Sequence, residues 1–157
     1  MRIEKRYMKC ALKEAVKAAE EDEVPVGAVV VLGDSIIASA HNEVETSNDA
    51  SAHAELIAMS RASEVLGTRY LNECVLYVTM EPCCMCAGAC LHYRIGAVAF
   101  GAYDDKCGAF GSTCDLGNGR YGIEIPVIGG IMRDECASIL GEFFRHKRQC
   151  QSSAKPI

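Results

Sequence analysis

The sequence lacks the features of membrane, secreted and repetitive proteins. Half of its 157 residues are hydrophobic, yet no stretch approaches the roughly 20 consecutive apolar residues of a membrane-spanning helix. The N-terminal segment carries Glu4 and Glu14 and has no apolar core, so we expect neither a signal peptide nor a transit peptide. No repeat, linker or low-complexity segment is present. We therefore expect a cytoplasmic protein with one compact domain over residues 1–150 and a flexible polar tail over residues 151–157.

The sequence also lacks an excess of positive charge, which phosphate-binding proteins usually display on one face. Its net charge is −5, from 16 basic and 21 acidic residues. Basic residues are nevertheless concentrated at both ends, with five against one acidic residue over 1–13 and four against one over 141–157. These segments are either solvated helix faces or contacts for a polyanion. Charge alone therefore neither establishes nor excludes a nucleic-acid partner.

Cysteine, in contrast, is abundant, with 10 residues in the chain. Because we expect no secretory signal, we interpret these as free thiols in a reducing compartment and not as a disulfide framework. Seven of them are interpreted as packing or surface thiols without a specific function: Cys10, Cys74, Cys90, Cys107, Cys114, Cys136 and Cys150.

The remaining three cysteines belong to the most informative pattern in the chain. His53-Ala54-Glu55 is followed about 28 residues later by Pro82-Cys83-Cys84-Met85-Cys86. One imidazole and two thiolates are good zinc ligands, and three protein ligands leave a fourth position open, as a catalytic zinc requires. Cys83 and Cys86 are three apart and share a helical face, whereas Cys84 would face elsewhere and is assigned to packing. The carboxylate of Glu55 beside this set could carry protons.

Each part of this pattern has a simpler reading on its own. A lone C-x-x-C can be a redox pair, half of a structural zinc site or two buried thiols. A non-enzymatic zinc module would close its site with a fourth ligand, for which His41 and His92 are the nearest candidates. That reading leaves Glu55 without a role, so the pattern favours an open, catalytic site.

Hydrophobic periodicity predicts helices over residues 3–21, 52–65, 82–93 and 133–150, and strands over 26–32, 36–40, 75–79, 95–100 and 123–128. Residues 42–50 and 101–122 are predicted loops. The order predicts an α/β protein with a central sheet covered by helices. On the second helix, we expect five apolar residues to be buried: Leu56, Ile57, Met59, Ala62 and Val65.

The predicted elements place His53 and the cysteine pair in the first turns of two helices. Helix N-termini favour negative charge, which promotes the thiolate form that a metal requires. In a helix body, however, His53 and Glu55 would project about 200° apart. They can converge on one site only if that site lies beyond the N-terminal end of the helix.

The chain resembles the bacterial tRNA-specific adenosine deaminases of the cytidine-deaminase-like superfamily, and H-x-E…P-C-x-x-C is the signature of zinc nucleobase deaminases. Similar stretches extend from about residue 23 to 148, including Glu23-Val24-Pro25-Val26-Gly27-Ala28, Ala52-His53-Ala54-Glu55, Glu81-Pro82-Cys83, Met85-Cys86-Ala87-Gly88-Ala89 and Phe143-Phe144-Arg145. The resemblance implies a three-layer α/β/α fold with a central mixed five-stranded sheet.

The resemblance also implies a reaction and the residues that carry it. His53, Cys83 and Cys86 would hold Zn²⁺, and Glu55 would act as the proton shuttle. The reaction would be the hydrolytic deamination of adenosine to inosine at the wobble position of the tRNA anticodon. The adenine would have to leave its stack to enter the site.

Four further residues are expected to contact the RNA. By the resemblance, Asn42 contacts the flipped nucleoside and Asp104 contacts the RNA beside it, while Arg145 and Arg148 in the basic C-terminal segment are expected to contact phosphates. The basic N-terminal segment is expected on the same side. Four residues depart from the family pattern in or near the Asp104 loop: Tyr103, Asp105, Cys107 and Phe110.

The alternative function is deamination of a free base or nucleoside, such as guanine or cytidine. Such an enzyme would share the zinc site but would not need the basic segment from Arg145 to Arg148. The resemblance also implies a homodimer built around the helix that contains Ala87, Gly88 and Ala89, whose small side chains allow close packing.

Overall fold

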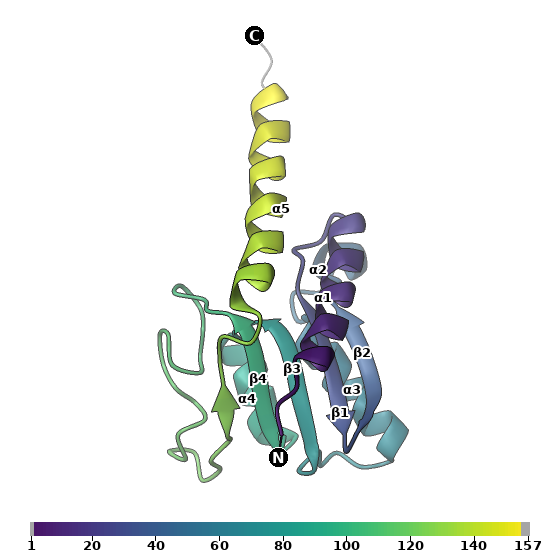
Figure 1. Cartoon of the computed structure of the whole chain (residues 1–157), viewed down its shortest axis with the longest axis vertical. Coiled ribbons are helices and arrows are strands. Elements are labelled where there is room, and N and C mark those ends of the chain that lie inside the picture. The colour runs from purple at the N-terminus through teal and green to yellow at the C-terminus, as the bar shows by residue number, and fades with distance from the viewer. Residues whose placement is uncertain (1, 155–157) are drawn as a thin grey trace.

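The computed structural model describes residues 2–154 and contains a five-stranded mixed sheet with helices on both faces (Figure 1). The elements are α1 (Lys5–Glu20), β1 (Gly27–Leu32), β2 (Ser35–His41), α2 (Val44–Ser47), α3 (Ala54–Leu66), β3 (Cys74–Met80), α4 (Cys84–His92), β4 (Ala97–Ala102), β5 (Val127–Ile128) and α5 (Arg133–Ser153). The strand order is β2-β1-β3-β4-β5. β1 is antiparallel to both β2 and β3, whereas β4 is parallel to β3 and β5. The predicted sheet is confirmed.

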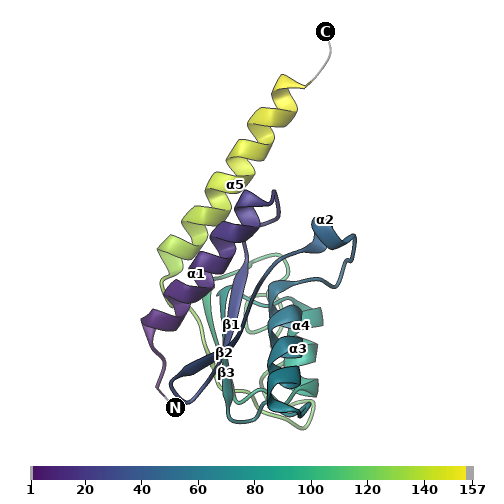
Figure 2. The same ribbon diagram turned by 90° about the vertical axis from the view of Figure 1, so that its right-hand side faces the viewer.

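The three layers follow from the alternation of side chains along the central strands. Val29 and Val31 of β1 face a core shared with α1 and α5, whereas Ala28 and Val30 face a second core shared with α3 and α4. β3 and β4 alternate in the same way, and nearly all of their residues are buried because both faces are covered. Figure 2 shows α1 and α5 on one side of the sheet and α3 and α4 on the other.

The strand directions bring four distant segments to one edge of the sheet. In the register of the sheet, Gly27 at the start of β1 pairs with His41 at the end of β2, and Met80 at the end of β3 pairs with Ala102 at the end of β4. The connections that begin or end at these residues therefore meet there. These are the connections before β1, after β2, after β3 and after β4.

Most element boundaries lie within two residues of the sequence prediction, and the fifth strand and the start of α4 show why they shift. The fifth strand covers only Val127–Ile128 and not residues 123–128, because Pro126 has no N–H to donate and the Ile125 amide donates to Gly117 in the preceding loop. The start of the helix predicted over residues 82–93 is also displaced: α4 begins at Cys84, with Cys83 as its N-cap. Proline favours an extended residue before it, here Glu81, and Cys83 after it is also extended, so the helix starts only at Cys84.

The exposure of Val65 and the structure of residues 42–50 also differ from the sequence prediction. Val65 is 65 % exposed and not buried, because the buried stripe of α3 continues from Met59 and Ala62 to Leu66 instead. The predicted loop over 42–50 contains the single turn of α2.

The C-terminal helix α5 is longer than predicted and continues to Ser153. It projects well beyond the sheet (Figures 1 and 2). Residues 155–157 of the predicted tail lie outside the described residues. In the part of the chain that the structure describes, no helix combines the length and apolar character needed to cross a membrane.

Candidate active site

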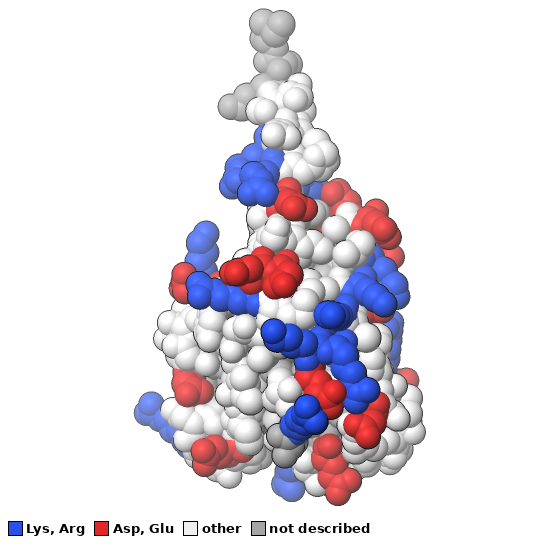
Figure 3. All heavy atoms as spheres, viewed as in Figure 1, with Lys and Arg blue, Asp and Glu red and all other residues white. Residues whose placement is uncertain are grey.

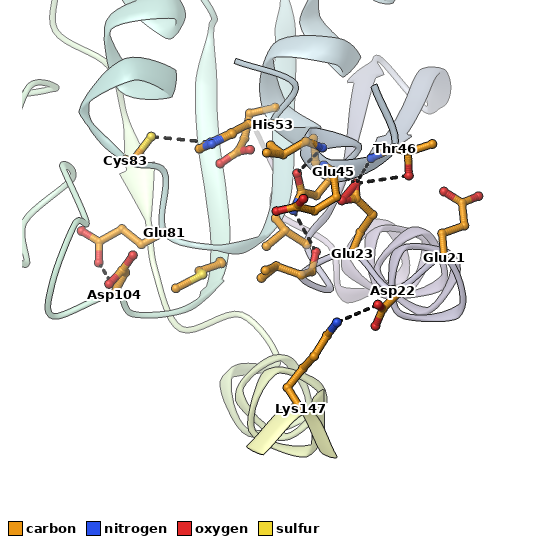
Figure 4. Close-up of a pocket in the computed structure, with 17 residues that line it drawn as sticks. Glu21, Asp22, Glu23, Glu45, Thr46, His53, Glu81, Cys83, Asp104 and Lys147 are labelled. Atoms are coloured by element: carbon orange, nitrogen blue, oxygen red, sulfur yellow. Dashed lines mark hydrogen bonds and ion pairs between the residues drawn. The ribbon is translucent and has the colours of Figure 1, made fainter. Parts of the chain in front are cut away.

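A cavity of about 720 Å³ opens where the four connections meet. This volume lies within the range of small-molecule sites, which is roughly 300–1,000 Å³. His53, Glu55 and Cys83 lie in its wall, together with residues from the end of α1, from α2 and from α5. Figure 4 shows these side chains around the cavity. The cavity is therefore built from elements that are far apart in the sequence.

His53, Cys83 and Cys86 form a compact group of potential metal ligands. Nδ1 of His53 lies 3.7 Å from Sγ of Cys83 and 3.5 Å from Sγ of Cys86. One ligand atom from each residue lies within 4.8 Å of the others. A tetrahedral zinc with bonds of about 2.3 Å to sulfur and 2.0–2.1 Å to nitrogen would hold its nitrogen and sulfur ligands roughly 3.5 Å apart. The donor set and its spacing therefore fit Zn²⁺.

The N-terminal ends of α3 and α4 bring these ligands together. His53 is the N-cap of α3 and Cys83 is the N-cap of α4, both with extended backbone. Because His53 lies outside the helical part of α3, its side chain is not subject to the angular separation expected in a helix body. This is how His53 and Glu55, the second residue of α3, can face the same site.

The pKa values of the two thiols are shifted in opposite directions. Cys86 donates to Cys83, and this hydrogen bond, with help from His53, lowers the pKa of Cys83 to about 3. Donation to Cys83, together with burial, raises the pKa of Cys86. The shared hydrogen bond thus favours the thiolate form of Cys83, and a metal that takes both sulfurs must displace the proton of Cys86.

Glu55 is the buried carboxyl group of the site, with 4 % of its surface exposed. Burial raises its pKa to about 7, against the opposing effect of His53. A group with a pKa near neutrality can both accept and release a proton efficiently. Glu55 therefore has the electrostatic properties of a general acid–base group.

Cys84 faces away from the ligand pair, as predicted, but its assignment to packing is wrong. It is exposed, whereas Cys86 is fully buried. The reason is the helical period, which turns the second residue of C-C-x-C away from the site and, in this helix, toward the surface.

Asn42 and Asp104 both line the cavity, on segments that follow β2 and β4. Asn42 accepts a hydrogen bond from the amide of Val44 and donates one to the carbonyl of Val24. The carboxylate of Asp104 accepts from the amides of Lys106 and Cys107. Both side chains therefore organise their own loops as well as facing the cavity.

Arg145 and Arg148 lie on α5 and are exposed, and neither lines the cavity. The α5 residue that does so is Lys147, whose ammonium group donates to Asp22 at 2.6 Å. Sequence reasoning did not single out Lys147, although the 3.6-residue period places it on a different face from its two arginine neighbours.

The basic N-terminal segment is separated from the cavity. Glu21 and Asp22, which directly follow α1, belong to the cavity wall, so Lys5 lies roughly 25 Å and Lys13 roughly 12 Å away along the helix. Figure 3 shows Lys and Arg side chains gathered over α1 and a second group on the projecting part of α5. Only the second group is close to the part of α5 that contributes to the cavity.

Sequence reasoning also missed two buried carboxylates in the cavity wall. Glu23 is fully buried and Glu81 is 2 % exposed. Both lie in stretches that resemble the adenosine deaminases, but nothing in their spacing indicated a role.

The fold and this site define a deaminase of the cytidine-deaminase-like class. Comparison with known proteins agrees: the model of the MafB19-like deaminase family matches residues 3–148. The tRNA-specific adenosine deaminase of Bacillus subtilis (strain 168) is 45 % identical over 150 residues, which cover 95 % of this chain and 93 % of the relative.

Solved structures show the same relationship. A tRNA:A34 deaminase that performs A-to-I editing superposes with a TM-score of 0.84 and 41 % identity over 87 % of this chain and all of the other. The guanine deaminase of Nitrosomonas europaea superposes with a TM-score of 0.80 and 26 % identity, covering 91 % of this chain and 85 % of the other. The chain belongs to the MafB19-like deaminase family and to the tRNA-specific adenosine deaminases within this fold.

Proposed function

We propose that this protein converts adenosine to inosine by hydrolytic deamination at the wobble position of the tRNA anticodon. The observation that carries the proposal is the grouping of His53, Cys83 and Cys86 beside the buried Glu55 in one cavity, in a chain 45 % identical to a tRNA-specific adenosine deaminase. The residues suit a metal-assisted proton transfer, and the family relationship supplies the substrate class.

His53, Cys83 and Cys86 would hold Zn²⁺, consistent with their donor atoms and spacing. When bound, zinc would activate water for attack by lowering its pKa to about 7. Glu55 would accept a proton from the attacking water and deliver it to N1 of adenine. It would then take the proton of the new C6 hydroxyl group and pass it to the amino group, which leaves C6 as ammonia.

Asn42 would contact the flipped nucleoside and Asp104 would contact the RNA beside it, and both residues line the cavity. The cavity is large enough for a nucleoside but not for a stacked duplex, so the target adenosine must leave its stack. An anticodon loop makes this step less costly, because its bases are already unpaired. The cavity therefore suits an adenosine presented by a loop.

The direct experiment is to incubate the purified protein with an anticodon stem-loop that carries adenosine at the wobble position. We expect inosine from this RNA, and no comparable turnover of free adenosine, cytidine or guanine. A stem-loop with guanosine at the same position is the matched control. Efficient turnover of free guanine without turnover of the stem-loop would instead support the function of the Nitrosomonas europaea relative.

The assembly is proposed to be a homodimer that packs through α4. This helix carries exposed Cys84 and Met85, and a side chain at Gly88 would meet no other atom within 4 Å in the single chain. Light scattering is expected to give twice the 16.9 kDa mass of the chain. Gly88→Glu should shift this mass toward the monomer, whereas Gly141→Glu on α5, also a helical glycine with space around it, should not. A monomer mass for active unsubstituted protein would contradict the proposal.

Arg145 and Arg148 are proposed to bind phosphates of the tRNA. Arg145→Ala or Arg148→Ala should weaken binding of the stem-loop and make the dependence of log affinity on log salt concentration shallower by roughly one unit. The single-turnover rate at saturation should change little, because these contacts are equal in the ground and transition states.

The measurement is affinity across a salt series, with Arg120→Ala as the control because Arg120 is exposed and does not line the cavity. If neither α5 variant differs from the control, the basic part of α5 is a solvated surface, and the free-nucleoside alternative gains support.

A further inference from the structure

Two buried carboxylates lie on opposite sides of the cavity in Figure 4 and take no part in the proposed chemistry. We propose that Glu23 and Glu81 are positioning residues, each of which holds one loop of the cavity wall in the conformation that receives the nucleoside. The first wall comprises residues 42–46, and the second wall comprises residues 104–112. The inference rests on the proposed function, because it assigns the walls their role in that reaction.

Glu23 holds the first wall through contacts with consecutive backbone groups. Its carboxylate accepts hydrogen bonds from the amide of Glu45 at 2.7 and 3.1 Å and from the amide of Thr46 at 3.4 Å. The preceding amide, that of Val44, donates to Asn42. Glu43, the N-cap of α2, makes no side-chain cap of its own. Glu23 and Asn42 together therefore satisfy the amides that would otherwise be unpaired at this turn.

Glu81 holds the second wall in the same manner. Its carboxylate accepts from the amides of Asp104, Phe110 and Ser112, each at 3.1 Å, and from the hydroxyl of Ser112. These donors span nine residues of a segment with no regular secondary structure. Besides the carboxylate, the amide of Ala109, which donates to the carbonyl of Pro82, ties the middle of this segment to the chain before α4.

Gly108 gives independent evidence that the second wall is built around Glu81. A Cβ atom added at Gly108 would lie 2.4 Å from the carboxylate of Glu81 and 2.6 Å from the carbonyl oxygen of Asp104. The absence of a side chain at Gly108 is therefore what lets the loop close around the buried acid.

A buried carboxylate that accepts several amide hydrogen bonds is an efficient way to fix a loop. Replacing it with glutamine keeps the shape but turns one acceptor oxygen into a donor that faces other donors. Burying these unpaired groups is unfavourable, so the loop relaxes away from them. Since misplacement of about 1 Å can lower a rate 100-fold, we expect Glu23→Gln and Glu81→Gln to slow single-turnover deamination by roughly 10- to 100-fold.

Double-mutant cycles on the single-turnover rate separate positioning from general stability. Glu23→Gln should be non-additive with Asn42→Ala, and Glu81→Gln should be non-additive with Asp104→Asn, because each pair acts through one wall. For the crossed pairs, which combine residues of opposite walls, the rate reduction in the double variant should equal the product of the two single-variant reductions within about twofold. Glu64→Gln is the control, because Glu64 is an exposed glutamate on α3 that belongs to neither wall and does not line the cavity. Fully multiplicative effects in all four pairs would overturn the inference.

Amide hydrogen exchange gives a readout that does not depend on activity. Glu23→Gln should accelerate exchange at Glu45 and Thr46 and leave Phe110 and Ser112 unchanged, whereas Glu81→Gln should do the reverse. Gly108→Ala should reproduce the pattern of Glu81→Gln without altering the acid. Uniformly faster exchange in both glutamine variants would show that these acids stabilise the whole fold and would refute a positioning role.

The two proposals fail in different ways. If the unsubstituted protein does not deaminate the stem-loop, the proposed function is wrong, yet the exchange pattern still decides whether each acid holds its own wall. If deamination proceeds but both glutamine variants retain the full rate, the proposed function stands and the positioning role is wrong.

Discussion

Glu55→Gln is expected to lower the deamination rate by roughly 10²- to 10⁴-fold, the usual contribution of a general acid–base group. The amide of glutamine fills the same buried space but cannot carry a proton between water and adenine. Since Glu55 is not one of the three grouped ligands, the variant should retain one zinc per chain. The measurement pairs inosine formation under single-turnover conditions with metal analysis of the same sample.

Glu64→Gln is the matched control, because Glu64 is an exposed glutamate on the same helix. Its rate and zinc content should equal those of the unsubstituted protein. Loss of stoichiometric zinc from folded Glu55→Gln would assign Glu55 to the ligand set, and an unchanged rate would remove it from the proton pathway.

Cys83→Ser and Cys86→Ser should each lose zinc and, with it, nearly all activity. Serine is similar in size, but its hydroxyl does not supply the soft thiolate that zinc binds at such sites. Metal analysis after dialysis against a mild chelator should show the loss directly. In the presence of zinc, both variants should unfold at a lower temperature than the unsubstituted protein, since a bound metal stabilises the folded state that holds it.

Cys84→Ser tests the assignment within the C-C-x-C stretch. Cys84 is exposed and does not belong to the ligand group, so its substitution should retain zinc and most activity. Retention of zinc by Cys83→Ser together with its loss from Cys84→Ser would show that the ligands had been assigned in the wrong frame.

The sequence alone was sufficient for the order of the elements and for the fold. Short apolar runs in β1, β3 and β4 and helical periodicity in α1 are local patterns, and the structure confirms the elements they predict. The potential ligands were also predictable, because metal chemistry restricts both residue type and spacing, and the structure groups the same three side chains.

Boundaries were less predictable because they depend on competing contacts. The fifth strand is short because Ile125 pairs with the preceding loop, and Val65 is exposed because Leu66 packs in its place. In both cases, the local pattern permitted two arrangements, and the surrounding packing selected one.

Tertiary structure alone decided how the site is built. His53 and Glu55 can face the same cavity because His53 is an N-cap outside the helix, a property of the backbone that periodicity does not specify. The sequence likewise contained no sign that Glu23 and Glu81 would each bind a distant loop, or that Lys147 would reach Asp22 across 125 positions of the chain. Hydrophobic patterns determine which face of an element is buried, but the meeting of element ends depends on strand register and helix packing, which arise only when the whole chain folds.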